Sequence, residues 1–514
     1  MNQILEAVRY WLGSAKQTSR RNDLDPYEAF PVHFIDQAGI IRDSIITYTF
    51  RYNYILEPTK LQDALVRLLQ SGDWRKMSGR LRRQIDGQLV IHVYANVKDH
   101  PPIRFSHVSY DVPVHEHPLG CRLPQPTGST PSIQEGWHQF RAFSVPPDLP
   151  NHISHYLRSD EPLLSLRIVS FADTTLVSIT FPHAVTDAMG TAGFLRAWSA
   201  MLRERPDEVP PLLGAKADIL ASVGSGDDEQ AQCPYVLEHW RLRGLALVRL
   251  ILRVGWDRLT ERNIQVRTIY LPVAFVAELR QIAQSECSHQ PGKEEKSAPT
   301  FLSDGDLIAA WGAQMILCAR AQRQRPAIIC NVFDLRRRVA GLSPRSGGVF
   351  LQNLILPVTT VIGPAPHGED SSIVSVGHLA CRIRQTIWEQ ATDGQARRLL
   401  RVVRATIAKT GLMPLFGRAD ATIIACTNWS KANFRDAAHF GPSAARHSSG
   451  PEDESGACVA YAGTTMGTTD HPRDTLVIYG QDNAGNYWIH GYLRDETWTL
   501  IQRVFGSRQP GAST

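Results

Sequence analysis

Strand-like and helix-like segments alternate along most of this chain, and this alternation restricts it to folds that mix the two. Residues 43–56, DSIITYTFRYNYIL, alternate in polarity and are rich in β-branched and aromatic side chains, which predicts a strand. Residues 58–69 follow with a proline at the start and four leucines on one face, which predicts a helix. The same order recurs in the second half, so the sequence predicts an α/β protein.

Two parts of the chain lack this regular alternation. Residues 98–158 are rich in proline and histidine and predict a loop-dominated region. Residues 205–235 hold prolines, glycines and charges with little periodicity, which is typical of a linker or crossover. Further strands are expected at 89–97, 163–170, 176–181, 268–271, 328–333, 354–361, 422–429, 457–463, 475–479 and 487–493, and further helices after Gly190, at 275–285, 303–320, 376–390 and 397–409, and from Glu496.

The length of 514 residues exceeds that of an ordinary single domain. We therefore expect an N-terminal domain over residues 1–204, the linker over 205–235, and a C-terminal domain over 236–514. Hydrophobic content of 43% and charged content of 20% are typical of a globular protein. The net charge of +5 and the lack of long like-charge runs argue against a nucleic-acid partner.

Targeting and redox signals are weak. Glu6 and Arg9 interrupt the apolar residues of the N-terminus, and no apolar run reaches the length of a membrane span. We expect a cytoplasmic protein without a membrane span. The eight cysteines show neither a C-x-x-C pair nor metal-ligand spacing, so they are expected to be reduced and mostly packed thiols.

Residues 241–256, RLRGLALVRLILRVGW, are apolar with interspersed arginines. A basic amphipathic stretch of this kind can lie on a membrane surface. An ordinary helix whose apolar face packs on a neighbouring domain has the same pattern. The sequence favours the packed helix.

A histidine and an aspartate four residues apart occur twice, at His183 and Asp187 and at His107 and Asp111. Such a short motif arises by chance in a chain with 18 histidines. Context separates the two pairs: a strand runs directly into His183 and a helix follows Gly190, whereas His107 falls in the loop-dominated region. Strand-to-helix junctions commonly carry functional side chains, so the first pair is the candidate site.

Several landmarks then follow in one order. After the strand, the His183-x-x-x-Asp187 motif, the helix and the linker come 331–338, NVFDLRRR, then 347–353, GGVFLQN, 427–429, TNW, and Phe440-Gly441. This series resembles the BAHD acyltransferases, and within them the divergent fungal enzymes that acylate terpenoids, polyketides and trichothecene-like alcohols. The resemblance covers nearly the whole chain.

The resemblance implies two chloramphenicol-acetyltransferase-like domains, each a mixed sheet with flanking helices, and a solvent channel between them. An acyl-coenzyme A, with acetyl-coenzyme A favoured, is expected as co-substrate from one face, and a hydrophobic small-molecule alcohol from the other. No permanently bound cofactor and no metal are expected, and the protein is expected to be a monomer.

The resemblance also implies roles for individual residues. His183 is expected to remove the proton of the acceptor hydroxyl, because a neutral imidazole is a suitable base near pH 7. Asp187 is expected to pair with Arg336 and to order the loop; a contact with His183 and a helix cap at the surface are the alternatives. Thr427 and Trp429 are implied as donors to the tetrahedral oxyanion, with ordinary strand and core roles as the alternative.

The chain departs from the family pattern at two places. The D-F-G-W-G loop of the family appears only as His439-Phe440-Gly441-Pro442-Ser443, and Ala188 stands where a glycine usually follows the aspartate. Phe440 and Gly441 are therefore a weak candidate for a loop at the coenzyme site. Two rival functions stay open: proton transfer, cyclisation or isomerisation by His183 without coenzyme A, and a non-catalytic small-molecule-binding protein.

Overall fold

A computed structural model of the chain describes residues 26–261, 263–288, 301–320, 325–343, 347–363, 375–444, 458–466 and 472–507. The strands are β1 (Tyr27–Pro31), β2 (Ile45–Tyr52), β3 (Arg80–Arg83), β4 (Leu89–Tyr94), β5 (Arg104–Ser109), β6 (Ser132–Glu135), β7 (Ser165–Ser170), β8 (Thr175–Pro182), β9 (Leu212–Leu213), β10 (Ile264–Leu271), β11 (Ala327–Asp334), β12 (Val349–Phe350), β13 (Ile355–Ile362), β14 (Thr422–Asn428), β15 (Ala460–Met466), β16 (Thr475–Gln481) and β17 (Tyr487–Arg494).

The α-helices are α2 (Gly39–Arg42), α3 (Pro58–Leu69), α4 (Arg141–Ser144), α5 (Ile153–Arg158), α6 (Ala188–Leu202), α7 (Gly244–Thr260), α8 (Val273–Ser288), α9 (Asp304–Ala319), α10 (Val376–Gln390), α11 (Asp393–Thr410), α12 (Phe434–Ala437) and α13 (Asp495–Gly506). This mixture of strands and helices confirms the predicted α/β class. Helices α3 and α10 begin and end at the residues that the apolar periodicity predicted.

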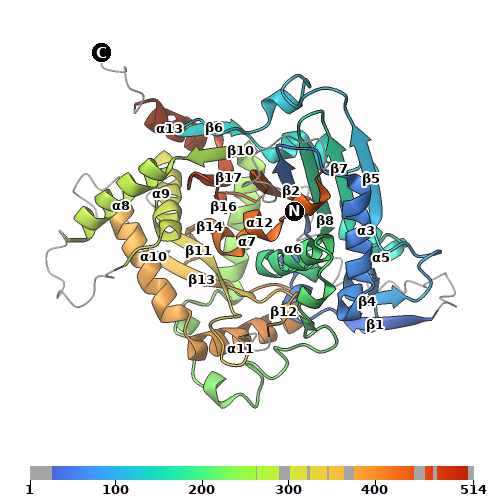
Figure 1. Cartoon of the computed structure of the whole chain (residues 1–514). Helices are drawn as coiled ribbons and strands as arrows, with labels where there is room; N and C mark the ends of the chain where they lie inside the picture. The colour runs from blue at the N-terminus through green and yellow to red at the C-terminus, as the bar shows by residue number, and fades with distance from the viewer. Residues whose placement is uncertain are drawn as a thin grey trace.

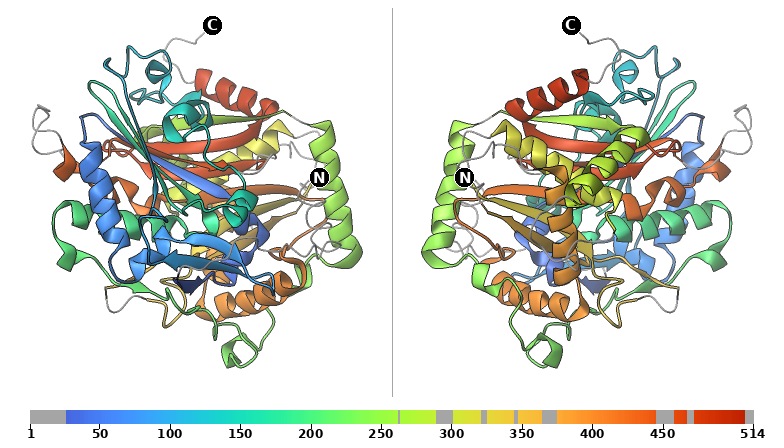
Figure 2. Two further views of the ribbon diagram at one scale, coloured as in Figure 1. Left: turned by 90° about the vertical axis from the view of Figure 1, so that its right-hand side faces the viewer. Right: turned by 90° about the vertical axis from the view of Figure 1, so that its left-hand side faces the viewer.

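Two large sheets carry the fold, and Figure 1 shows the N-terminal half on one side of the molecule and the yellow-to-red C-terminal half on the other. The N-terminal sheet has the order β15-β2-β8-β7-β5, and the C-terminal sheet has the order β13-β11-β14-β16-β17-β10-β6. Figure 2 gives the same arrangement from two further sides. Both sheets contain parallel and antiparallel pairs.

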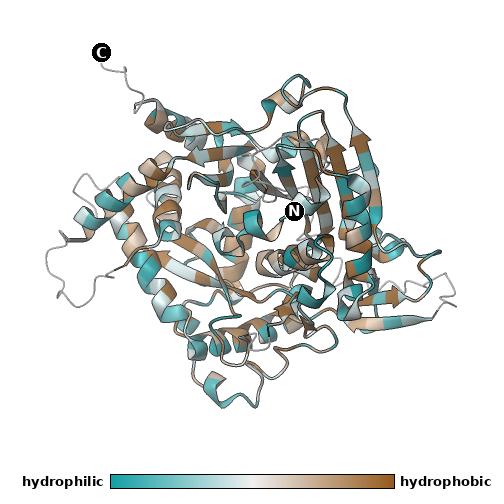
Figure 3. Ribbon diagram, in the orientation of Figure 1, coloured by the Kyte–Doolittle hydropathy of each residue, from teal (hydrophilic) through white to brown (hydrophobic). Residues whose placement is uncertain are grey.

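The central strands β2 and β8 are buried along all their residues, and brown apolar segments run along the strands in Figure 3. On the N-terminal side, α3 and α6 pack against each other. On the C-terminal side, α8, α9 and α10 form a packed group whose apolar residues share one core with the sheet. Burial of these strands and helices supplies most of the driving force for folding.

The two sheets exchange strands across the expected linker. Strand β15, from the C-terminal half of the chain, pairs with β2 in the N-terminal sheet, and β6, from the N-terminal half, pairs with β10 in the C-terminal sheet. A division of the chain at 205–235 therefore does not separate the two sheets. The domain limits of 1–204 and 236–514 stay a prediction.

Two sequence expectations need correction. Loops make up most of region 98–158, as expected, but His107 does not lie in a loop: the region also contains β5 and β6, and His107 lies on β5, paired in parallel with β7. Its short strands have few apolar residues, so their pairing depends on neighbours distant in sequence. The cysteines are also not all reduced, because Cys287 on α8 and Cys381 on α10 form a disulfide across a separation of 94 residues. Contact between these helices is a tertiary property that cysteine spacing does not reveal.

Helix α7 meets a third expectation only in part. Its apolar residues were expected to pack on a neighbouring domain; Leu250 is buried and Leu247, Ile251 and Val254 are half-buried, but other apolar side chains of the helix are exposed. Leu245 is 88% exposed and Trp256 is 66% exposed. No helix among the described residues is long and apolar enough to cross a membrane.

Candidate functional site

His183 stands at the junction between a buried strand and a buried helix. Strand β8 ends at Pro182, a 3-10 turn covers His183–Val185, and α6 begins at Ala188. The backbone N–H of His183 donates to the carbonyl of Ser44 at 2.8 Å, just before β2 begins. The position of the histidine is thereby fixed by the two central strands of the N-terminal sheet.

One ring nitrogen of His183 forms a hydrogen bond within the turn. Its Nδ1 lies 3.0 Å from the carbonyl oxygen of Thr186. Because a carbonyl can only accept, Nδ1 carries the proton and Nε2 is the basic nitrogen. Burial of the ring lowers the pKa of His183 below its ordinary value near 6.5, although its hydrogen bond to Thr186 and the charge of Asp187 oppose this. The ring is therefore a neutral base at physiological pH.

Asp187 is buried and does not contact the imidazole. Its Oδ1 accepts the backbone N–H of Gly190 at 2.9 Å and so caps α6. Its Oδ2 accepts the backbone N–H of Leu354 at 2.9 Å. Each of the two oxygens also accepts a hydrogen bond from the Arg336 guanidinium, at 3.0 Å. Asp187 thus combines the ion pair that the family resemblance implied with a helix cap, the alternative expected for an exposed aspartate.

Arg336 connects this carboxylate to the segment 350–354 of the other half. Its guanidinium also donates to Asp334 Oδ1 at 2.8 Å and to the carbonyls of Phe350 and Gln352 at 3.0 Å each. A planar guanidinium satisfies this number of acceptors at once. The pair therefore locks the start of α6 against the chain that follows β12.

Two further residues hold the His183 turn, and sequence reasoning missed their role. The side-chain amide of Asn353 donates to the carbonyl of His183 at 2.8 Å and to Asp36 Oδ1 at 2.7 Å. The backbone N–H of Asn353 also donates to Asp36 at 3.0 Å. Burial raises the pKa of Asp36 to about 7, against the hydrogen bonds from Asn353 and the charge of Lys76. Asn353 belongs to the GGVFLQN landmark, but no local signal marks Asp36.

Close packing around position 190 explains why a glycine stands there, two residues after Ala188. A Cβ at this position would lie 2.3 Å from the carbonyl oxygen of Leu351 and 2.3 Å from Thr186 Oγ1. A larger residue would push the 350–354 segment away from α6. Gly190 therefore permits the close approach that Asp187 and Arg336 hold.

Thr427 and Trp429 lie at the end of β14 in the C-terminal sheet. Thr427 is opposite Val477 of β16. The Trp429 ring packs between Tyr48 of β2 and Tyr479 of β16, with centroid distances of 5.4 Å and 5.5 Å. Trp429 therefore bridges the two sheets. The structure records no contact of either residue with His183.

Phe440 is a core residue. It is fully buried and its ring packs on Trp198 of α6 and on Tyr52 of β2, at centroid distances of 4.4 Å and 5.7 Å. Gly441 begins a 3-10 turn, Gly441–Ser443. The Phe440 side chain thus supports the helix that follows the His183 turn, and its aromatic ring has no exposed surface for a coenzyme.

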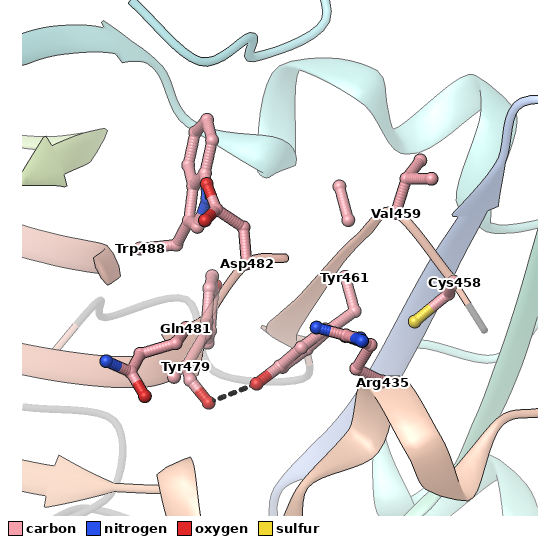
Figure 4. Close-up of a pocket in the computed structure, with 10 residues that line it drawn as sticks. Arg435, Cys458, Val459, Tyr461, Tyr479, Gln481, Asp482 and Trp488 are labelled. Carbon is pink, nitrogen blue, oxygen red and sulfur yellow. Dashed lines mark hydrogen bonds between the residues drawn. The ribbon is translucent and has the colours of Figure 1, made fainter. Parts of the chain in front are cut away.

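A pocket lies where β15 of the N-terminal sheet meets β16 and β17 of the C-terminal sheet, and Figure 4 shows its lining. Tyr461 and Tyr479 face each other there, and the Tyr461 hydroxyl donates to the Tyr479 carbonyl at 2.6 Å. Arg435, Asp482 and Trp488 complete the polar and aromatic wall. His183 is not among the lining residues, so this pocket is distinct from the turn that holds it.

The second histidine motif has a different environment. His107 is exposed on β5, with Nε2 3.0 Å from the Ser170 hydroxyl. In the same region of the chain, His117 Nδ1 accepts backbone N–H groups from Leu119 and Gly120. Within the described ranges, no group of three His, Cys, Asp or Glu side chains could hold a metal ion.

Comparisons with known proteins agree with this architecture. No protein-family model matches the chain. Acetyltransferase BOT5 of Botryotinia fuckeliana is 47% identical, over 93% of this chain and 90% of its own length. Acetyltransferase pyiB of Pyricularia grisea is 33% identical, over 94% of each protein.

Solved structures show the same fold at low sequence identity. The F. graminearum TRI101 structure complexed with coenzyme A and T-2 mycotoxin matches with a TM-score of 0.62 at 13% identity, over 93% of this chain and 97% of that one. Vinorine synthase matches with a TM-score of 0.55 at 13% identity, over 94% and 93%. Together with the curated relatives, these matches show that the chain is an acyltransferase and belongs to the fungal branch of the BAHD-type acyltransferase family.

Proposed function

We propose that this enzyme transfers an acetyl group from acetyl-coenzyme A to a hydroxyl of a hydrophobic small molecule, with His183 as the general base. Two relatives support the group that is transferred: the 47% identical protein is named an acetyltransferase, and PaAT-2 of Phomopsis amygdali, 31% identical, is named an O-acetyltransferase. The TRI101 structure was solved with coenzyme A and a mycotoxin, which supports both substrate classes.

The observation that carries the proposal is the 3.0 Å contact between His183 Nδ1 and the Thr186 carbonyl, which fixes the tautomer of the ring. Because Nδ1–H is held by the Thr186 carbonyl, Nε2 carries the lone pair that can accept a proton. The acceptor hydroxyl gives its proton to Nε2 while its oxygen forms a bond to the thioester carbonyl carbon. The tetrahedral intermediate then loses the thiolate of coenzyme A, which takes the proton from the imidazolium. This sequence needs no covalent acyl-enzyme.

The oxyanion of the intermediate requires hydrogen-bond donors. The proposal assigns this role to the Thr427 hydroxyl on β14 and to the indole N–H of Trp429, which directly follows β14 and packs on Tyr48 of the other sheet. Loss of one well-placed donor costs about 10²–10³ in kcat. Trp429→Phe keeps the aromatic packing on Tyr48 and removes the N–H, so a kcat within about threefold of wild type would exclude the indole as a donor.

Asp187, Arg336 and the 439–443 loop act indirectly in this proposal. The ion pair positions the turn, and the Phe440-Gly441 segment supports α6 near the coenzyme side. The proposal also includes a cytoplasmic monomer with domains 1–204 and 236–514 joined by the linker 205–235. Sedimentation velocity tests the monomer, and microscopy of the fluorescently tagged protein tests the location.

Replacement of His183 by alanine tests the proposed base. Loss of a general base should reduce the rate of acetyl transfer by about 10²–10⁴ while the protein stays folded. His107→Ala is the matched control, because it removes the histidine of the second motif on an exposed part of β5. Equal rates for wild type and His183→Ala, measured as free thiol released from acetyl-coenzyme A, would exclude the mechanism.

Binding of the co-substrate separates the two rival functions. Acetyl-coenzyme A should raise the melting temperature of the wild-type protein, since a ligand that binds only the native state stabilises it by RT ln(1 + [L]/Kd). If His183 acts as a base in a reaction without coenzyme A, the melting temperature should not change. A non-catalytic binding protein predicts a shift without any ester product in mass spectrometry.

A further inference from the structure

Helix α7 carries an exposed apolar stripe on the outside of the molecule. Leu245, Val248, Leu252 and Trp256 are 88%, 50%, 69% and 66% exposed. Their spacing of three, four and four residues places them on one face of a helix. We call these four side chains the α7 stripe. Figure 2 shows α7, in light green, standing along the outer edge of the molecule.

The opposite side of α7 attaches the helix to the protein. Leu250 is 2% exposed and faces the body. Arg253 donates to the carbonyls of Ala419 and Ala421, which precede β14. The helix is thus fixed in place while the α7 stripe points away from the core. An exposed apolar row of this size on a fixed helix marks a binding surface.

The apolar surface continues beside the first turn of α7. Trp240 and Leu415 are 36% and 39% exposed. Backbone hydrogen bonds hold their segments together: the Leu242 N–H donates to the Leu415 carbonyl at 2.9 Å, and the Gly417 N–H donates to the Trp240 carbonyl at 2.8 Å. Two exposed tryptophans therefore lie on or beside the same helix.

The charges around the stripe select the class of partner. Residues 241–260 contain five arginines and a single acidic residue, Asp257. Arg241 and Arg253 are half-buried and pair with Glu238 and Asp257, so the charge at the stripe comes from the exposed arginines alone. Arg249 is exposed and lies one turn before Leu252, beside the α7 stripe, and Arg243 is exposed at the N-cap, where Glu238 pairs with it. Arginines next to apolar and tryptophan side chains match an anionic lipid surface, where the head groups bind the guanidinium groups. A second copy of α7 would instead bring like charges together.

We propose that α7 is a membrane-surface anchor that seats the α7 stripe in the head-group region of anionic phospholipid. The helix lies on the surface and does not span it. Such an anchor would hold the enzyme at the membrane, where an apolar acceptor concentrates; this advantage rests on the proposed function. The α7 stripe is separate from the turn that holds His183.

Flotation with phospholipid vesicles tests the anchor. Wild-type protein should float with phosphatidylcholine vesicles that contain phosphatidylserine and should remain unbound with pure phosphatidylcholine. Leu252→Glu and Trp256→Glu should each lower the bound fraction by about tenfold, because each removes an apolar side chain from the lipid and adds a negative charge. Arg249→Glu should weaken binding most at low salt.

Ile85→Glu is the matched control. Ile85 is fully exposed in the turn between β3 and β4, so the change makes the same substitution away from α7. It should leave vesicle binding unchanged. Leu252→Glu and Trp256→Glu should each keep wild-type acetyl transfer to a water-soluble alcohol, because neither residue belongs to the proposed site.

Four results would overturn the proposal: no binding of wild type to either vesicle, equal binding to both, retained binding in the two α7 variants, or a dimer in sedimentation that Leu252→Glu dissolves without any lipid binding. The last result would assign the α7 stripe to a second copy of the chain.

Discussion

At the residue scale, the proposed reaction depends on which nitrogen of His183 is basic. The Thr186 carbonyl fixes the proton on Nδ1, and Asp187 is committed to Gly190, Leu354 and Arg336. The aspartate therefore supports the turn without acting on the imidazole, in contrast to a hydrolase triad, in which an aspartate holds the imidazole directly. We therefore expect His183 to affect mainly the catalytic rate, and the pair of Asp187 and Arg336 to affect mainly the free energy of unfolding.

The pH dependence of kcat/KM should report His183. Since burial lowers its pKa, the basic form is present above that pKa and is lost as pH falls through it. The acid limb should lie below pH ~6.5, the ordinary histidine value, and kcat/KM should be level from about pH 7 to 8. Initial rates of thiol release across this range provide the measurement. An acid limb centred above pH ~7 would contradict a buried neutral base.

Loss of Arg336 should destabilise the protein more than it changes chemistry. Arg336→Met leaves Asp187 buried without its counter-ion, which costs about 3–5 kcal/mol in free energy of unfolding. Urea denaturation measures this cost. Arg337→Met is the control. Because Arg337 is exposed, this substitution should change the free energy of unfolding by no more than about 0.5 kcal/mol. Similar values for both variants would show that the pair is not structurally important.

At the element scale, the close contact between the start of α6 and the 350–354 segment determines the geometry of the turn. Gly190 supplies the space, Arg336 and Asp187 supply the attraction, and Phe440 packs behind the helix on Trp198. The strand, the turn and the helix are thus held from both sides.

A methyl group at position 190 should disturb this contact. Gly190→Ala should lower stability by about 1–3 kcal/mol through overpacking and reduce kcat, because the Leu351 carbonyl must move. Gly255→Ala in α7 is the control, since open space surrounds that position and alanine favours a helix by about 0.5–1 kcal/mol. Thermal unfolding and steady-state kinetics of both variants test the difference. A stable, fully active Gly190→Ala enzyme would contradict the required close approach.

At the scale of the whole molecule, the two halves are joined by exchanged strands and by the Asp36–Asn353 link. Strand β15 completes the N-terminal sheet, and β6 completes the C-terminal sheet. Asp36 and Asn353, 317 residues apart in sequence, meet beneath the His183 turn. The catalytic geometry is therefore a property of the assembled chain.

Separated halves should not fold alone. A fragment of residues 1–204 lacks β15, which leaves a β2 edge rich in apolar residues unpaired. We expect this fragment to aggregate or to bind a hydrophobic dye, and co-expression with residues 205–514 should restore a soluble complex. Circular dichroism and gel filtration measure the outcome. A monomeric, cooperatively folded 1–204 fragment would show that the exchanged strand is dispensable.

The Asp36–Asn353 link should affect kcat more than KM. Asp36→Asn weakens the acceptor that orients Asn353, and the His183 turn loses part of its support, so we expect kcat to fall about ten- to a hundredfold. Asp218→Asn is the control, because Asp218 accepts N–H groups of Phe34 and Leu220 without contacting Asn353. An equal change in both variants would assign the effect to general loss of charge.

The amino-acid sequence was enough to predict the α/β order, the position of His183 between a strand and a helix, and the bounds of α3 and α10. These features depend on neighbouring residues, whose periodicity and backbone preferences are local. The Asp187–Arg336 pair was reached from the family resemblance, and the structure brings the two residues together.

Contacts between residues that lie far apart in the chain became known only from the folded protein. The β15 and β6 exchange, the Asp36–Asn353 link, the Cys287–Cys381 disulfide and the outward α7 stripe depend on how packed elements meet. A pattern of apolar residues predicts that a helix has an apolar face. It does not predict which surface covers that face, because burial depends on contacts with elements that are distant in sequence.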